Sequence, residues 1–181
     1  MKANAKRTSG FVLGVVRTGN ILEKILDFIG GIAISVFVGA IFLDVAARTA
    51  GSTLRPCQEI ALFAFVWAIF TGSAIAVRDN SHFAIDIVIG AFKGIPKKII
   101  EIVGRMAVSI FAVVLLVYGW QYAVICLKRF SQPSGICMTV GTSCIVFGAV
   151  CMIFYCIEYF ILSFSGTDLR TCKEKLSEAK K

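Results

Sequence analysis

Four long apolar stretches dominate the pattern of hydrophobic and polar positions. They cover about residues 25–47, 60–77, 98–127 and 137–162. The second stretch has no charged residue over about 18 positions, close to the minimum length of a helix that crosses a bilayer. Backbone groups in lipid must bond internally, and the stretches do not alternate as barrel strands would. The pattern therefore predicts an all-α integral membrane protein with four transmembrane helices.

The polar flanks divide the chain into an N-terminal arm (1–20), a membrane domain (21–164) and a tail (165–181). The apolar run Phe11–Val16 is too short and too interrupted by glycine for a signal-peptide core, so we expect the N-terminus to be retained. The third apolar stretch runs from about residue 98 to 127, roughly 43 Å as a helix, whereas a hydrocarbon core is ~30 Å thick. We expect this helix to tilt strongly or to project from the membrane.

Lysine and arginine lie mostly on one side of the predicted spans. The arm, the connection after the second stretch and the tail are rich in them, whereas the other two connections hold only Arg48, Arg55, Lys128 and Arg129. Basic connections stay in the cytoplasm. Both termini are therefore predicted to be cytoplasmic.

The connection between the second and third spans contains an apolar segment, 82–95, that is too short to cross a membrane. On a helix, His82, Asp86 and Lys93 would share one face and apolar side chains would cover the rest. This pattern predicts an amphipathic helix that lies in the cytoplasmic interface or flat against a partner. A re-entrant or irregular loop is the alternative.

Small residues recur at four-residue spacing in three of the stretches. They are Gly31, Ser35 and Gly39 in the first, Ala64, Ala68, Gly72 and Ala76 in the second, and Gly141, Cys144, Gly148 and Cys151 in the fourth. Such stripes let helix backbones approach closely in membranes. They can pack the four helices together or dock another membrane subunit, and the two interpretations are compatible.

Composition excludes several classes of protein. The net charge is +8, but the basic residues lie at the ends of apolar stretches and form no nucleic-acid-binding motif. The seven cysteines form no C-x-x-C pair, which argues against thioredoxin-like and zinc-ribbon sites. A single histidine excludes a haem held by two axial histidines of this chain. Cys57 and Cys137 lie on connections predicted to share one side, so a disulfide between them can form.

The candidate polar groups in the spans are few. The centres of the stretches carry no charge, so we expect no buried charge and no proton pathway. Oxygens of Thr71 and Ser73 could face a sodium ion, but no acid accompanies them, and helix packing is the competing interpretation. His82 and Asp86 have i, i+4 spacing but no further metal ligand, so helix capping competes with metal binding. We predict no catalytic, metal or substrate site and no cofactor in this chain.

Charged residues near the predicted membrane boundaries can pair along helices. Asp44 and Arg48 are four residues apart at the end of the first stretch, and Glu101 and Arg105 have the same spacing near the start of the third. Arg55 and Glu59 lie beyond the first pair. The charges around the outward loop, from Asp44 to Glu59, can anchor the helices at the interface or form a surface for a soluble partner.

One stretch has a family-like order of residues. The first span ends in Asp44–Arg48, Glu59 opens the second, Trp67 follows, and Thr71–Arg78 reads Thr-Gly-Ser-Ala-Ile-Ala-Val-Arg before His82 and Asp86. This order, with the four spans, resembles the small DctQ-like membrane subunit of tripartite ATP-independent periplasmic (TRAP) transporters over about residues 20–164. Two departures are Gln58, where the family often has a second acid, and the cysteine-rich fourth span.

The resemblance implies a non-enzymatic permease subunit of the bacterial inner membrane. Such a subunit pairs with a large sodium-coupled elevator subunit, which holds the sodium ions and the substrate, and serves as its scaffold among the membrane lipids. A periplasmic solute-binding protein delivers the substrate, an organic acid with a carboxylate or sulfonate. The alternative is an unrelated four-span assembly or redox subunit. The predicted partner-interface residues are Arg48, Arg55, Glu59, Ala64, Trp67, Ala68, Gly72, Ala76, Arg78, His82, Asp86, Lys128 and Arg129.

Overall fold

The chain folds into long helices. The structure, a computed structural model, describes residues 10–52, 54–79, 95–131, 135 and 137–165. Its helices are α1 (Gly10–Thr49), α2 (Arg55–Arg78), α4 (Ile95–Cys126) and α5 (Thr139–Ser165). All four contain segments long and apolar enough to cross a membrane, and the described residues form no strand. The prediction of an all-α fold with four such helices is confirmed. The predicted interfacial helix lies almost wholly outside the described residues and stays a prediction.

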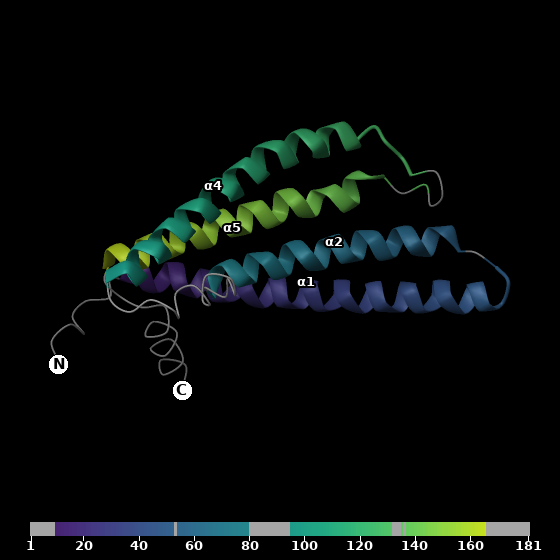
Figure 1. The fold of residues 1–181 in the computed structure, drawn as a ribbon, viewed down its shortest axis with the longest axis horizontal. Coiled ribbons are helices and arrows are strands. Elements are labelled where there is room, and N and C mark those ends of the chain that lie inside the picture. Colours follow the sequence, from purple (N-terminus) through teal and green to yellow (C-terminus); the bar gives the residue numbers. More distant parts are fainter. Residues whose placement is uncertain (1–9, 53, 80–94, 132–134, 136, 166–181) are drawn as a thin grey trace.

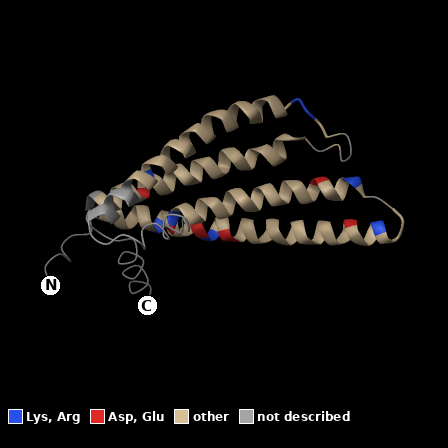
Figure 2. Cartoon of the chain, in the orientation of Figure 1, with Lys and Arg blue, Asp and Glu red and all other residues tan. Residues whose placement is uncertain are grey.

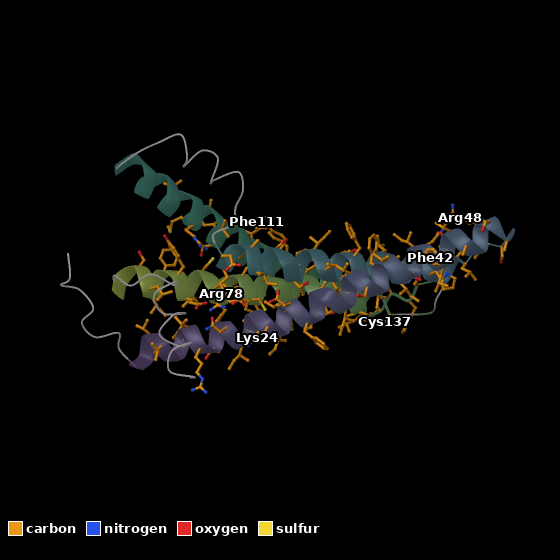
Figure 3. All side chains as sticks on the ribbon, turned by 90° about the horizontal axis from the view of Figure 1, so that it is seen from below. Lys24, Phe42, Arg48, Arg78, Phe111 and Cys137 are labelled. Atoms are coloured by element: carbon orange, nitrogen blue, oxygen red, sulfur yellow. The ribbon has the colours of Figure 1, made fainter. Side chains whose placement is uncertain are left out.

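The helices lie in the order α1, α2, α5, α4 across the molecule (Figure 1). α2 packs between α1 and α5, whereas α4 packs mainly on α5. Gly10, Arg78, Ile95 and Ser165 are at the same end of the bundle, which we call the Arg78 end. The opposite end, which holds the α1–α2 and α4–α5 connections, is the Asp44 end. Near the Arg78 end, α4 diverges from the other three helices (Figure 3).

α1 begins ten residues or more before the predicted first span. Its first turns lie in the segment that the sequence suggested as a polar arm, yet Val12 and Val16 are buried there. They pack against Leu162 and the partly buried Ile161 near the end of α5. The helix continues this far because the extension of α5 offers an apolar surface for it to cover.

Charged side chains in the described helices gather at the two ends of the bundle, and the middle is almost free of them (Figure 2). Asp27 and Asp44 bound the uncharged part of α1, and Glu59 and Arg78 bound that of α2. At ~1.5 Å per residue these pairs are roughly 26 Å and 28 Å apart along their helices. A hydrocarbon core is ~30 Å thick. The spacing of the charges therefore matches one membrane.

The glycines show which stripes pack inside this chain. A Cβ on Gly148 would lie 3.0 Å from Cβ of Phe70, and one on Gly141 would collide with the ring of Phe63. The stripe of the fourth stretch is thus the surface on which α2 packs. By contrast, no atom of the described chain would lie within 4 Å of a Cβ on Gly39 or Gly72, nor of one on Gly31.

The α1–α2 turn at the Asp44 end has an unambiguous local cause. Gly51 adopts φ +78°, its N–H donates to the carbonyl of Arg48 at 3.0 Å, and the N–H of Ser52 donates to that of Ala47 at 2.9 Å. This is a Schellman ending, in which glycine takes the left-handed conformation. Pro56 then lies in the first turn of α2, where its missing N–H costs nothing.

The disulfide that the sequence allows is not formed. Cys57 and Cys137 are both free thiols at the Asp44 end. Cys137 lies 3.4 Å from the hydroxyl of Thr139, and this hydrogen bond lowers the pKa of the thiol.

Candidate functional site

The most developed polar site is built around Arg78, in the last turn of α2. Its side chain is 1% exposed, as is that of Glu158 on α5. Arg78 Nε and Nη2 donate to the two carboxylate oxygens of Glu158 at 3.2 and 3.0 Å, a bidentate ion pair. The guanidinium carbon also lies 5.4 Å from the ring centre of Tyr155, one turn earlier on α5. Two helices are therefore joined through a single buried cation.

α1 supplies the remaining acceptors for Arg78. Nη1 donates to Glu23, and Nη2 donates to Asn20 Oδ1 at 2.7 Å and to the carbonyl of Val16 at 3.4 Å. These residues follow one another at helical spacing on the face that meets α2 and α5. Gly19 lies among them without a side chain, which leaves room for the carboxylate and the guanidinium. We call Asn20, Glu23, Arg78, Tyr155 and Glu158 the Arg78 cluster; Figure 3 shows Arg78 between α1 and α5.

A second arginine ties α4 to this end of the bundle. Arg105 is buried, and its Nη1 donates to the carbonyl of Val77 at 2.6 Å. That carbonyl belongs to the last turn of α2, where the helix itself provides no donor. The Arg105 guanidinium also lies 4.2 Å from the ring centre of Tyr159 on α5. The predicted pairing of Arg105 with Glu101 stays a prediction, because the side chain of Glu101 is outside the described part.

The expectation of no buried charge was wrong. Arg78, Arg105 and Glu158 are buried, and the side chain of Glu23 is only 19% exposed. A lone buried charge is very unfavourable, but these four have opposite signs in equal number, and the ion pairs compensate much of the desolvation. The arrangement is suited to holding helices in register. The described residues contain no group of three metal-ligating side chains.

A smaller polar contact joins α1 and α2 at the Asp44 end. Asp44 is buried, and Nε2 of Gln58 donates to its two oxygens at 3.3 and 3.1 Å. Arg48 Nε lies 3.3 Å from Asp44 Oδ2, which confirms the predicted pair. An acid at position 58 would instead place a second carboxylate against Asp44.

Two other outward residues of the predicted interface, Arg55 and Glu59, lie at an open pocket of about 430 Å³. It is lined by Arg55, Gln58, Glu59, Leu62 and Ser131. Lys128 and Arg129 are exposed in the α4–α5 connection at the same end. The structure thus brings the outward charges to one end of the bundle, with a hollow between the start of α2 and the α4–α5 connection.

The predicted interface residues along α2 have different surroundings. Trp67 is used inside the chain, because its Nε1 donates to the carbonyl of Val140 at 3.0 Å and its ring lies 6.0 Å from that of Phe147. Gly72 is exposed, and the three alanines of the stripe are partly buried: Ala64, Ala68 and Ala76. His82 and Asp86 lie outside the described residues. The interface role of all these residues stays a prediction.

Sequence reasoning missed the partners of Arg78. A signal for one of them was present, because Glu158 is the only acid in the fourth apolar stretch. An isolated acid in a span usually faces a partner inside the bundle. No local signal marked Asn20 or Glu23, which lie before the predicted first span.

A model of the family described as "Tripartite ATP-independent periplasmic transporters, DctQ component" matches residues 37–166, more than half of the chain. The chain belongs to the DctQ family. The suspected resemblance is therefore confirmed, and this family is a permease component of TRAP transporters. The matched range contains Arg78, Arg105 and Glu158, and it excludes the α1 residues of the Arg78 cluster.

Two similar proteins, both from Haemophilus influenzae, carry the name "Putative TRAP transporter small permease protein". One is 27% identical over 99 residues and the other 23% identical over 97 residues. The alignments cover 54% and 53% of this chain and 59% and 60% of those relatives. The chain thus matches about three fifths of the length of the relatives.

Proposed function

We propose that this DctQ-family chain is the small permease subunit of a TRAP transporter and acts as a scaffold for a large membrane subunit. The observation that carries the proposal is the family match over a bundle of four helices long enough to span a membrane. In this proposal the bundle crosses the bacterial inner membrane with the Arg78 end, and hence both termini, in the cytoplasm. The chain itself binds no substrate and no cofactor.

The transport roles of the partners complete the proposal. The large subunit moves an organic acid, a carboxylate or sulfonate, coupled to sodium, and a periplasmic binding protein delivers that acid. A moving subunit needs an immobile neighbour. The Arg78 cluster supports this role, because it joins α1, α2 and α5 through buried ion pairs and hydrogen bonds. An unrelated assembly or redox subunit has less support, because the family match favours a transporter.

The small-residue stripe of α2 gives the first test. Replacing Gly72 with leucine should leave the chain folded, because no described atom would touch the new Cβ. If a helix of the large subunit packs there, the leucine separates the two backbones. We expect recovery of the co-expressed large subunit with the tagged chain to fall at least fivefold, with a parallel loss of uptake.

Gly39→Leu is the matched control, since Gly39 on α1 is equally open and is not in the predicted interface. This variant should still recover the large subunit with the tagged chain and should support uptake as the unaltered chain does. If Gly72→Leu and the unaltered chain recover the large subunit equally, this stripe of α2 does not contact the large subunit.

The outward charges give the second test. Arg55 lines the pocket at the Asp44 end, and Arg129 is exposed in the connection beside it. If the binding protein docks there through acidic residues, Arg55→Glu with Arg129→Glu should reduce uptake at limiting binding protein about tenfold and recover at high concentration. Unchanged uptake at limiting binding protein would exclude a docking role for these arginines.

A further inference from the structure

One complete face of α1 has no partner in the described chain. It is opposite the stripe that packs on α2 and α5, and all its members are exposed. We call this the outer face of α1, and it consists of Arg17, Ile21, Lys24, Phe28, Gly31, Ser35, Gly39 and Phe42. Phe28 and Phe42 are 71% and 73% exposed, and the three small residues lie between them.

Two cations mark one end of this face. Within the described residues, Arg17 and Lys24 are exposed and form no ion pair or hydrogen bond through their charged groups. Lys24 lies about one turn before Asp27, where the uncharged part of α1 ends, and Arg17 is about 10 Å further along the helix. This range of depth corresponds to the lipid headgroups beside a ~30 Å hydrocarbon core. Figure 3 labels Lys24 and Phe42 toward the two ends of α1.

We propose that the outer face of α1 binds an anionic phospholipid. Arg17 and Lys24 hold the phosphate group above Ile21, and an acyl chain lies along the exposed small residues that follow Phe28 on the same face. From Lys24 to Ser35 the helix rises roughly 16 Å, about the depth of one leaflet of a ~30 Å hydrocarbon core. The inference goes beyond the proposed scaffold role and takes from it only the cytoplasmic position of the Arg78 end, where the leaflet is negatively charged.

Charge and depth favour a lipid over other occupants. A second copy of the chain packed in parallel would place Arg17 and Lys24 against the same cations. An acidic segment of another protein would satisfy the charges but leave the headgroup depth of both cations unexplained. Asp27 is a nearby exposed acid, and it lies about 60° around the helix from Lys24 and about 80° from Arg17, so it weakens the positive field without filling the face.

The test places a reporter on the face. Phe28→Trp is made in the full chain, co-expressed with the large subunit and reconstituted in symmetric bilayers of phosphatidylcholine with a minor share of phosphatidylglycerol. One or the other lipid carries bromine, which quenches nearby tryptophan, and the same sample without Phe28→Trp corrects for Trp67 and Trp120. Each of the two cations should raise the preference for phosphatidylglycerol over phosphatidylcholine roughly fivefold. Together they should raise this preference up to ~30-fold.

We expect brominated phosphatidylglycerol to quench the introduced tryptophan far more than its share of the bilayer. Arg17→Gln with Lys24→Gln should abolish this preference, Asp27→Asn should increase it, and the matched pair Lys128→Gln with Arg129→Gln should leave it unchanged. Quenching in proportion to bilayer composition would overturn the proposal. So would the absence of quenching by either lipid, which would mean that protein covers the face. Continued co-purification of the large subunit would show that the proposed function stands in either case.

Discussion

Replacing Arg78 with alanine should destabilise the protein by about 3–5 kcal/mol, the usual cost of leaving a buried partner charge uncompensated. Glu158 is 1% exposed and would lose its bidentate partner, and Glu23 and Asn20 would lose their donor. The free energy of unfolding, measured by titration with sodium dodecyl sulfate in mixed micelles, checks this. The loss should be accompanied by separation of α1 from α2 and α5 at the Arg78 end.

Arg48→Ala is the control, because it also removes an arginine from an ion pair, but this arginine is 57% exposed and Asp44 keeps the hydrogen bonds from Gln58. It should cost about 1 kcal/mol or less. If Arg78→Ala does not fold, Arg78→Ala with Glu158→Gln should restore part of the stability, since the uncompensated carboxylate is then absent. Equal costs for the Arg48 and Arg78 variants would show that the Arg78 cluster does not hold the bundle together.

The same substitution at two glycines of α1 should have opposite effects. A Cβ on Gly19 would lie 2.6 Å from Glu158 Oε2 and 2.7 Å from Arg78 Nη2, two side chains already held by their ion pair. Gly19→Ala should therefore cost about 1–3 kcal/mol, as overpacking does. Gly14→Ala, one and a half turns earlier, meets nothing within 4 Å and should stabilise the helix by about 0.5–1 kcal/mol.

Both variants can be compared in one denaturation series with the unaltered chain. If Gly19→Ala were also stabilising, the guanidinium and carboxylate would have room to move, and the Arg78 cluster would be looser than its distances indicate. Gly14→Ala would then measure only the difference in helix propensity between alanine and glycine.

Much of the fold was predictable because lipid imposes simple rules. The uncharged length of Ile60–Val77 and its counterparts predicted spanning helices, and the structure places α2 over Arg55–Arg78. The close pair of Asp44 and Arg48 was predictable too, because residues four apart meet on any helix. Gly51 and Pro56 mark the first turn through local conformational preferences that need no distant partner.

The candidate site depended on contacts between distant parts of the chain. Arg78 meets Glu158, 80 residues away, and Glu23, 55 residues away. No periodicity within one helix specifies which acid from another helix lies at the same depth. The length of α1 was missed for the same reason, because Val12 and Val16 are stable in a helix only where α5 covers them.

The sequence by itself determined the class of the protein, its four spanning helices and its family, because hydrophobic length and short-range spacing act along a single helix. Only the tertiary structure decided that the small-residue stripe of α5 is internal, that Arg78 is buried among acids from two other helices, and that one face of α1 is left uncovered. The physical reason is that burial and charge pairing are properties of neighbouring helices, and the neighbours of a helix are set by the fold.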